Sequence, residues 1–112
     1  MVIRQLHRPA TAIFLAVAVA MSAACTKPAP RTHVVTMNNF VFEPAELTVS
    51  RGDTIVWSNT DFVPHTATAR DGGWDSKAVA AGGSWRFVAS APGRHEYYCI
   101  FHPTMKGTIE VR

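Results

Sequence analysis

The sequence has only two cysteines in 112 residues, Cys25 and Cys99. A small exported domain stapled by disulfides needs several cysteines within its folded part. Cys25 lies at the end of an N-terminal leader, outside the predicted domain, so Cys99 is left as a single thiol. We therefore expect no disulfide. A lone thiol in an oxidising compartment is a liability unless something binds it.

The sequence also lacks an excess of charge of one sign. After residue 24, nine Lys and Arg stand against eight Asp and Glu, which leaves a net charge of +1 with neutral histidines. The basic pI of 9.2 for the whole chain partly reflects Arg4 and Arg8 in the leader. This balance indicates no nucleic-acid partner.

A long hydrophobic run is missing as well. The longest, Ala12–Met21, has about ten residues, whereas a membrane-spanning helix needs roughly 20. Arg4 and Arg8 precede this run and small residues follow it, which is the three-part layout of a secretory signal peptide. The alternative, a buried N-terminal helix, fits these flanking residues poorly. We predict that residues 1–24 are a signal peptide and that the protein is exported.

The end of the leader, "SAAC", resembles a bacterial lipoprotein cleavage box, in which the cysteine becomes the lipidated first residue. Ser22 departs from that pattern, which prefers an aliphatic residue there. Pro28 and Pro30 favour an extended, semi-rigid linker. We predict a linker over residues 25–31, lipidated at Cys25, that tethers the protein in the bacterial periplasm or cell envelope. Cleavage to a soluble exported protein is the alternative.

From Thr32 onward the sequence shows short β-rich segments and no helix of ordinary length. Turn signals separate these segments, as in "RGD", where Gly52 can take a positive φ. Seven or eight short strands over residues 32–112 predict an all-β domain, an antiparallel sandwich. Its predicted core comprises Phe40, Phe42, Leu47, Val49, Ile55, Trp57, Phe87, Tyr97, Ile109 and Val111.

The segment "CIFHPTM" places Cys99, His102 and Met105 at every third position. On one straight strand such residues would point to opposite faces, and Pro103 argues against a helix. A tight loop would turn all three inward, and His65, at the start of another predicted strand, could complete the cluster. Taken singly, His102 and Met105 could be an ordinary loop residue and a core filler.

One thiolate and two imidazoles with a weak axial thioether describe a blue-copper electron-transfer site that cycles between Cu(I) and Cu(II). Structural zinc normally takes four Cys or His ligands, for which Met105 is a poor substitute. A binuclear copper centre would need a second nearby cysteine. A catalytic site would need an open position and a general base, and the nearest carboxylate in sequence is Glu96. We therefore predict no catalytic residues and no enzymatic activity.

On these motifs the chain resembles the cupredoxins, the blue copper proteins, and within them the plastocyanin–amicyanin–pseudoazurin group. The resemblance covers residues 32–112 and is most specific in "APGRHEYYCIFHPTMKGTIEV". It implies a Greek-key β-sandwich and one copper ion bound by His65, Cys99, His102 and Met105. Thr66 stands where the family often has Asn, and a hydroxyl there can still hydrogen-bond. His95 stands where an aromatic residue is usual.

The resemblance implies a mobile or tethered one-electron carrier, in which the edge of His102 is the electron port and Phe101 and Pro103 form an apolar docking patch. We expect a monomer that meets its redox donor and acceptor transiently. The alternative is a periplasmic copper-binding or trafficking protein using the same ligands. Multicopper enzymes with this fold have longer chains and additional copper ligands.

Overall fold

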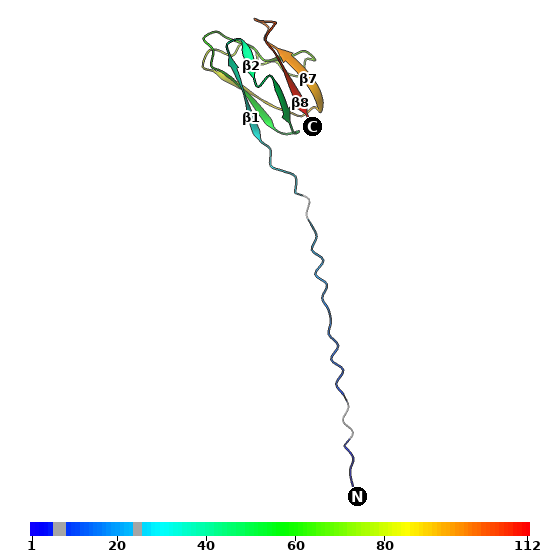
Figure 1. The fold of residues 1–112 in the computed structure, drawn as a ribbon. Coiled ribbons are helices and arrows are strands. Elements are labelled where there is room, and N and C mark those ends of the chain that lie inside the picture. Colours follow the sequence, from blue (N-terminus) through cyan, green and yellow to red (C-terminus); the bar gives the residue numbers. More distant parts are fainter. Residues whose placement is uncertain (6–8, 24–25) are drawn as a thin grey trace.

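The computed structural model describes residues 1–5, 9–23 and 26–112. All of the secondary structure in these residues is β, and it begins at Thr32; the segments before it lead away from the folded part as an extended chain (Figure 1). The described residues include no helix long and apolar enough to cross a membrane. The predicted cleavage point and Cys25 lie outside the described residues, so both stay predictions.

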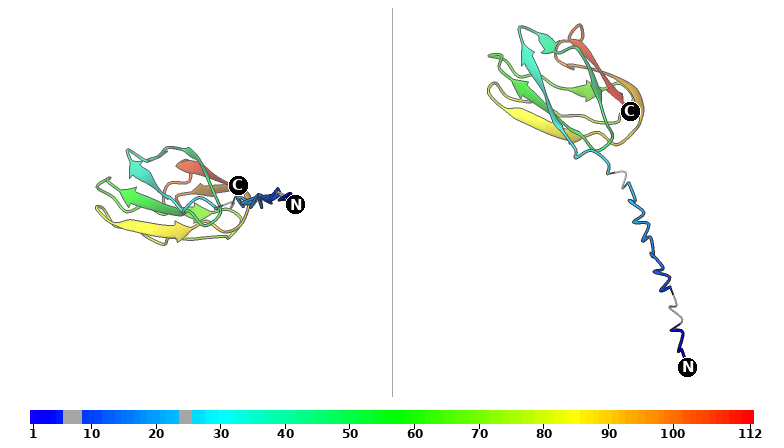
Figure 2. Two further views of the ribbon diagram at one scale, coloured as in Figure 1. Left: turned by 90° about the horizontal axis from the view of Figure 1, so that it is seen from below. Right: turned by 60° about the horizontal axis from the view of Figure 1, so that its bottom comes forward.

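Eight strands form two four-stranded sheets that pack face to face (Figure 2). The first sheet has the order β2–β1–β4–β6, formed by Val41–Glu43, Thr32–Asn38, Thr54–Asn59 and Ser84–Val88. The second has the order β3–β8–β7–β5, formed by Glu46–Val49, Lys106–Val111, Gly93–Tyr98 and Thr68–Ala69. The predicted all-β Greek-key sandwich is confirmed.

The prediction that the sandwich is antiparallel is wrong for two strand pairs. β1 pairs with β4 in parallel, and β3 pairs with β8 in parallel, so both sheets are mixed. In each case the chain crosses to the other sheet before the partner strand begins. Alternation of apolar residues indicates which face of a strand is buried, but it does not indicate which strand lies beside it.

The core lies between the two sheets and is rich in aromatic side chains. Seven of the predicted core residues are buried, and Leu47 and Phe87 pack against them while partly exposed. Trp57 in β4 contacts Tyr97 in β7 across the sandwich, with ring centroids 5.5 Å apart. Because Trp57 and Tyr97 come from opposite sheets, their contact helps to fix the distance between the layers.

Phe40 is the one predicted core residue that the structure places elsewhere, since its side chain is 42% exposed. Asn39 and Phe40 connect β1 to β2, and both have positive φ angles, 51° and 59°. A two-residue hairpin of this type requires left-handed backbone at both positions. The turn therefore carries Phe40 out of the core, and its ring packs on histidines, as described below.

The register of the strands defines two ends of the sandwich. At one end, which we call the base, β1 and β4 begin side by side, and β8 ends beside the start of β7. At the other end, which we call the tip, lie the loops of residues 39–40, 60–67 and 99–105. Figure 1 shows the C-terminus at the same end as the N-terminal segment, so both termini belong to the base.

Asp53 stabilises the base of the sandwich. Its carboxylate accepts hydrogen bonds from the backbone N–H groups of Arg31 and Ser50, and His33 Nε2 lies 2.9 Å from its Oδ2. The Arg31 N–H, the His33 ring and the Ser50 N–H all favour the ionised carboxylate, and they lower the pKa of Asp53 to about 2. His33 is thus a structural partner of Asp53.

Candidate metal centre

His65 is held at the tip by the end of β4. The side-chain amide of Asn59 donates hydrogen bonds to the carbonyl oxygens of Val63 and Val79, both at 2.9 Å. His65 and Val79 exchange two backbone hydrogen bonds in an isolated bridge. This bridge corrects the prediction that His65 begins a strand, because β5 starts only at Thr68. The His65 side chain is fully buried.

The segment after β7 forms the tight loop that the sequence predicts. The His102 N–H donates to the Cys99 carbonyl at 3.2 Å, and the Met105 N–H donates to the His102 carbonyl at 2.9 Å. The Cys99 N–H closes the loop on the Met105 carbonyl at 3.1 Å. This backbone network brings Cys99 and His102 to one side of the loop, where they meet His65.

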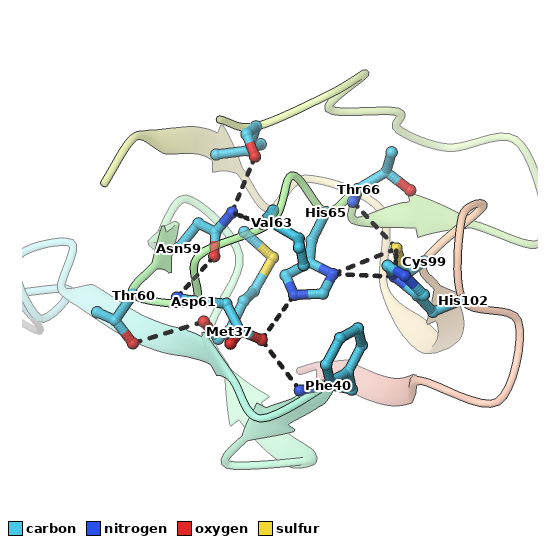
Figure 3. Close-up of polar contacts among 11 residues, drawn as sticks. Met37, Phe40, Asn59, Thr60, Asp61, Val63, His65, Thr66, Cys99 and His102 are labelled. Atoms are coloured by element: carbon cyan, nitrogen blue, oxygen red, sulfur yellow. Dashed lines mark hydrogen bonds and ion pairs between the residues drawn. The ribbon is translucent and has the colours of Figure 1, made fainter. Parts of the chain in front are cut away.

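Three donor atoms converge at this point (Figure 3). Cys99 Sγ lies 3.7 Å from His65 Nδ1 and 3.6 Å from His102 Nδ1, and the two Nδ1 atoms are 3.2 Å apart. The centre of a triangle with sides of this length lies about 2 Å from each corner, which is the length of a metal–imidazole bond. The three side chains therefore fit one metal ion in a trigonal arrangement.

Met105 ends the same loop and is buried, with 2% of its surface exposed. Three of the four predicted ligands, His65, Cys99 and His102, form the group of converging donor atoms. Met105 is joined to two of them through its backbone hydrogen bonds, and its role as an axial ligand stays a prediction.

Thr66 connects the two ligand-bearing loops. Its N–H donates to Cys99 Sγ at 3.3 Å, and its hydroxyl oxygen accepts the N–H of Ile100 at 2.8 Å. Thr68 adds a hydrogen bond between the two hydroxyl groups at 3.0 Å. Thr66 thus makes the link for which the resembled family often uses Asn, and it joins the loop of His65 to the loop of Cys99 through both its backbone and its side chain.

Asp61 is a site residue that the sequence analysis missed. Its Oδ2 lies 2.8 Å from His65 Nε2 and accepts the N–H of Phe40 at 3.1 Å. Both hydrogen bonds lower the pKa of Asp61 below its usual range, and the hydrogen bond from His65 has the larger effect. Its position four residues before His65 was the available signal, but in a loop that spacing does not fix where a side chain points.

The surface of the tip around His102 is apolar. The His102 side chain is half-buried, Phe101 and Ile100 are 51% and 46% exposed, and Pro103 is also exposed. The ring of Phe40 stands edge-on to His102 with centroids 4.7 Å apart. The predicted electron-transfer residues thus lie together at the tip, and Phe40 adds to this surface.

His95, where the family usually has an aromatic residue, has no contact with the three donor atoms. Its Nδ1 lies 2.6 Å from Asp71 Oδ2, and its Nε2 lies 2.8 Å from the Ala91 carbonyl oxygen. The Asp71 carboxylate raises the pKa of His95. This departure from the family pattern therefore leaves the metal centre unchanged.

A β-sandwich that gathers one thiol and two imidazoles between loops at one end has the architecture of a protein that binds a single copper ion. The family model for cupredoxin-like domains matches residues 11–111, and the chain belongs to this family. Cupredoxins bind one copper ion, and the grouping of His65, Cys99 and His102 suits such an ion.

Curated relatives and solved structures agree with this assignment. The chain is 30% identical over 97 residues to amicyanin-alpha of Methylorubrum extorquens, covering 82% of this chain and 81% of the relative. It is 30% identical to a plastocyanin of a Synechococcus species, covering 66% and 67% of the two chains. A purple cupredoxin from Nitrosopumilus maritimus superposes with a TM-score of 0.67 at 26% identity, covering 71% of this chain and 99% of the other.

Proposed function

We propose that this protein is an exported blue copper protein that carries single electrons between redox partners. In this proposal His65, Cys99 and His102 bind the copper ion in a trigonal plane, and Met105 is a weak axial ligand. The triangle of Cys99 Sγ and two histidine Nδ1 atoms is the observation that carries the proposal. The softness of a thiolate suits Cu(I), and imidazole accepts both oxidation states.

Burial of the ligands favours electron transfer over copper trafficking. His65 and Cys99 have no exposed surface, and Met105 has 2%. A ligand set enclosed in this way hinders the handover of copper to a partner, whereas electrons need only a short path through an exposed ligand edge. His102, the least buried of the four, supplies that edge amid the apolar Phe101 and Pro103.

The carboxylate that is hydrogen-bonded to His65 gives no support to an enzymatic function. Asp61 is already hydrogen-bonded to His65 and to the Phe40 backbone, and 6% of its surface is exposed. It is therefore poorly placed to act as a general base for a substrate.

Carriers of this kind bind a donor and an acceptor transiently through small surfaces, and we expect the protein to be a monomer.

The test is to add one equivalent of Cu(II) to the purified domain and to record visible and EPR spectra. We expect an intense blue or green thiolate-to-copper band. Rapid electron self-exchange without loss of copper would support the carrier, whereas ready transfer of copper to an acceptor protein would favour the trafficking alternative.

Replacing Met105 tests its role as the axial ligand. Met105→Leu removes a weak donor to Cu(II), so the reduction potential should rise, on the order of tens of millivolts, while the thiolate band survives. Met105→Gln supplies a harder oxygen and should lower the potential. Voltammetry compares the variants. If Met105 only packs, Leu should cost under about 1.5 kcal/mol of stability and both potentials should match the parent.

Phe101→Glu tests the docking surface. A carboxylate on this half-exposed side chain should repel the approach of an identical molecule through its apolar tip and slow electron self-exchange severalfold. The visible spectrum should stay nearly unchanged because Phe101 is not a predicted ligand. Self-exchange rates from NMR line broadening provide the measurement, and an unaltered rate would place the electron port elsewhere.

We also propose that the domain is tethered through a lipid on Cys25, on the basis of "SAAC" and the proline-containing linker. Full-length protein made in a bacterial host should partition into the detergent phase, and Cys25→Ala should release it or block its processing. Mass spectrometry of the mature N-terminus decides this, because any first residue other than a lipidated cysteine contradicts the tether.

A further inference from the structure

Asp61 is a buried carboxylate on the opposite side of the His65 ring from Cys99 (Figure 3). It is 6% exposed, and its ion-pair partner among the described residues is His65. The Asn59 side chain accepts the Asp61 N–H at 3.0 Å and donates to two carbonyl groups. The backbone of Asp61 is thus fixed independently of the carboxylate.

The hydrogen bond between Asp61 and His65 determines which ring nitrogen carries the proton. An ionised carboxylate only accepts hydrogen bonds, so the proton of a neutral His65 ring lies on Nε2, 2.8 Å from Asp61 Oδ2. Nδ1 is then left with a lone pair directed at Cys99 Sγ and His102 Nδ1. This is the form of His65 that a metal ion requires.

The charge of Asp61 also distinguishes the two oxidation states of bound copper. A thiolate cancels the whole charge of Cu(I) but only half the charge of Cu(II), so the oxidised site keeps one positive charge. A carboxylate one imidazole ring away attracts that charge more strongly in a buried setting than in water. Asp61 therefore stabilises the oxidised site more than the reduced site.

We propose that Asp61 is a positioning residue that fixes the tautomer and orientation of His65 and makes the bound copper harder to reduce. This inference rests on the proposed function. The competing interpretation is that Asp61 only supports the turn at Phe40, whose N–H it accepts at 3.1 Å. A supporting role alone would affect the stability of the fold and leave the reduction potential unchanged.

Asp61→Asn removes the charge and keeps the shape and an oxygen that can accept the His65 Nε2–H. Asp53→Asn is a matched control, because Asp53 also pairs with a histidine, His33, at 2.9 Å but lies at the base. Removal of an outer partner of a metal ligand typically costs about 10–100-fold in metal affinity. Because the charge of Asp61 matters more to the oxidised site, we expect Asp61→Asn to lose about tenfold more affinity for Cu(II) than for Cu(I). For one electron, this tenfold difference raises the potential by about 59 mV.

Competition titrations with Cu(II) and Cu(I) chelators, together with voltammetry, measure these effects, and thermal unfolding of the metal-free proteins measures stability. Asp53→Asn should lower the unfolding temperature and leave the potential at the parent value. The proposal is overturned if Asp61→Asn lowers the unfolding temperature without moving the potential, or if the two variants shift the potential equally.

A second measurement needs neither a variant nor bound copper. Nitrogen-15 NMR of the metal-free parent protein reports the tautomer of each histidine, and we expect His65 to be protonated at Nε2. A proton on Nδ1 would overturn the positioning role even if Asp61→Asn failed to fold. Failure of the proposed function would look different, because the parent would then lack the thiolate-to-copper band whatever tautomer His65 adopts.

Discussion

Cys99→Ser should abolish the intense visible band of the copper-loaded protein completely. The band requires a thiolate bound to Cu(II), and Cys99 is the thiol that lies within reach of both histidine Nδ1 atoms. A serine hydroxyl does not ionise near neutral pH and is a harder, weaker ligand for Cu(I). The affinity for Cu(I) should therefore fall by more than about 100-fold, beyond the loss expected from removing an outer partner of a ligand.

The fold should survive this substitution, because serine has nearly the shape of cysteine and its oxygen can accept the Thr66 N–H that now points at Sγ. Far-UV circular dichroism of the metal-free variant checks that the sandwich is retained. Cys25→Ala is the matched control, since it removes the other cysteine and should leave the band intact. A colourless Cu(II) complex of the parent, or a band that persists in Cys99→Ser, would refute the blue-copper assignment.

Gly107→Ala should destabilise the domain more than its small size suggests. Gly107 lies directly opposite Tyr97 in the pairing of β7 with β8, and the Tyr97 ring covers it. A Cβ atom at this position would overlap that ring and lie 2.5 Å from Tyr97 Oη. The ring has little room to move, because it packs against Phe42 and Trp57 at centroid distances of 4.6 Å and 5.5 Å.

Overpacking of this kind costs about 1–3 kcal/mol, and each kcal/mol lowers the unfolding temperature of a domain of this size by about 4–8 °C. Thermal unfolding of the metal-free protein followed by circular dichroism measures the loss. Gly73→Ala is the comparison, because its new Cβ would meet only the exposed side chain of Asp71, outside the core, so at most the hydrogen bonds of Asp71 would loosen and the loss should be smaller. Equal unfolding temperatures for Gly107→Ala and the parent would mean that Tyr97 does not cover Gly107.

The sequence identifies most of the core and the region of the metal centre because those features are local. Buried residues alternate along β4, where Ile55 and Trp57 face inward, and alternation can be read residue by residue. Cys99 and His102 are only three residues apart, and the hydrogen-bonded loop that contains them brings them together. His65 entered the prediction as a histidine that could complete the cluster, and the resemblance to a family supported it, since no local pattern connects it to a loop 34 residues away.

The features that the sequence did not reveal depend on contacts between distant segments. The parallel pairing of β1 with β4 follows from how the chain crosses between sheets, which alternation does not record. Phe40 has a large apolar side chain, as core residues do, but its left-handed turn places the ring against the two histidines. Asp61 looks like an ordinary loop acid until the fold places it behind His65.

The separation of tip and base restricts which partners a tethered molecule can reach. The chain enters the sandwich at Thr32, at the base, whereas His102 lies at the tip. If residues 25–31 are fully extended, they span about 20 Å, so an anchored domain would stay within about that distance of the membrane surface. In its upright orientation, such a domain presents His102 away from that surface. If Cys25 carries the proposed lipid, the partners of such a domain would be proteins whose docking faces stand well above the membrane, and the linker would set the effective concentration at which they meet.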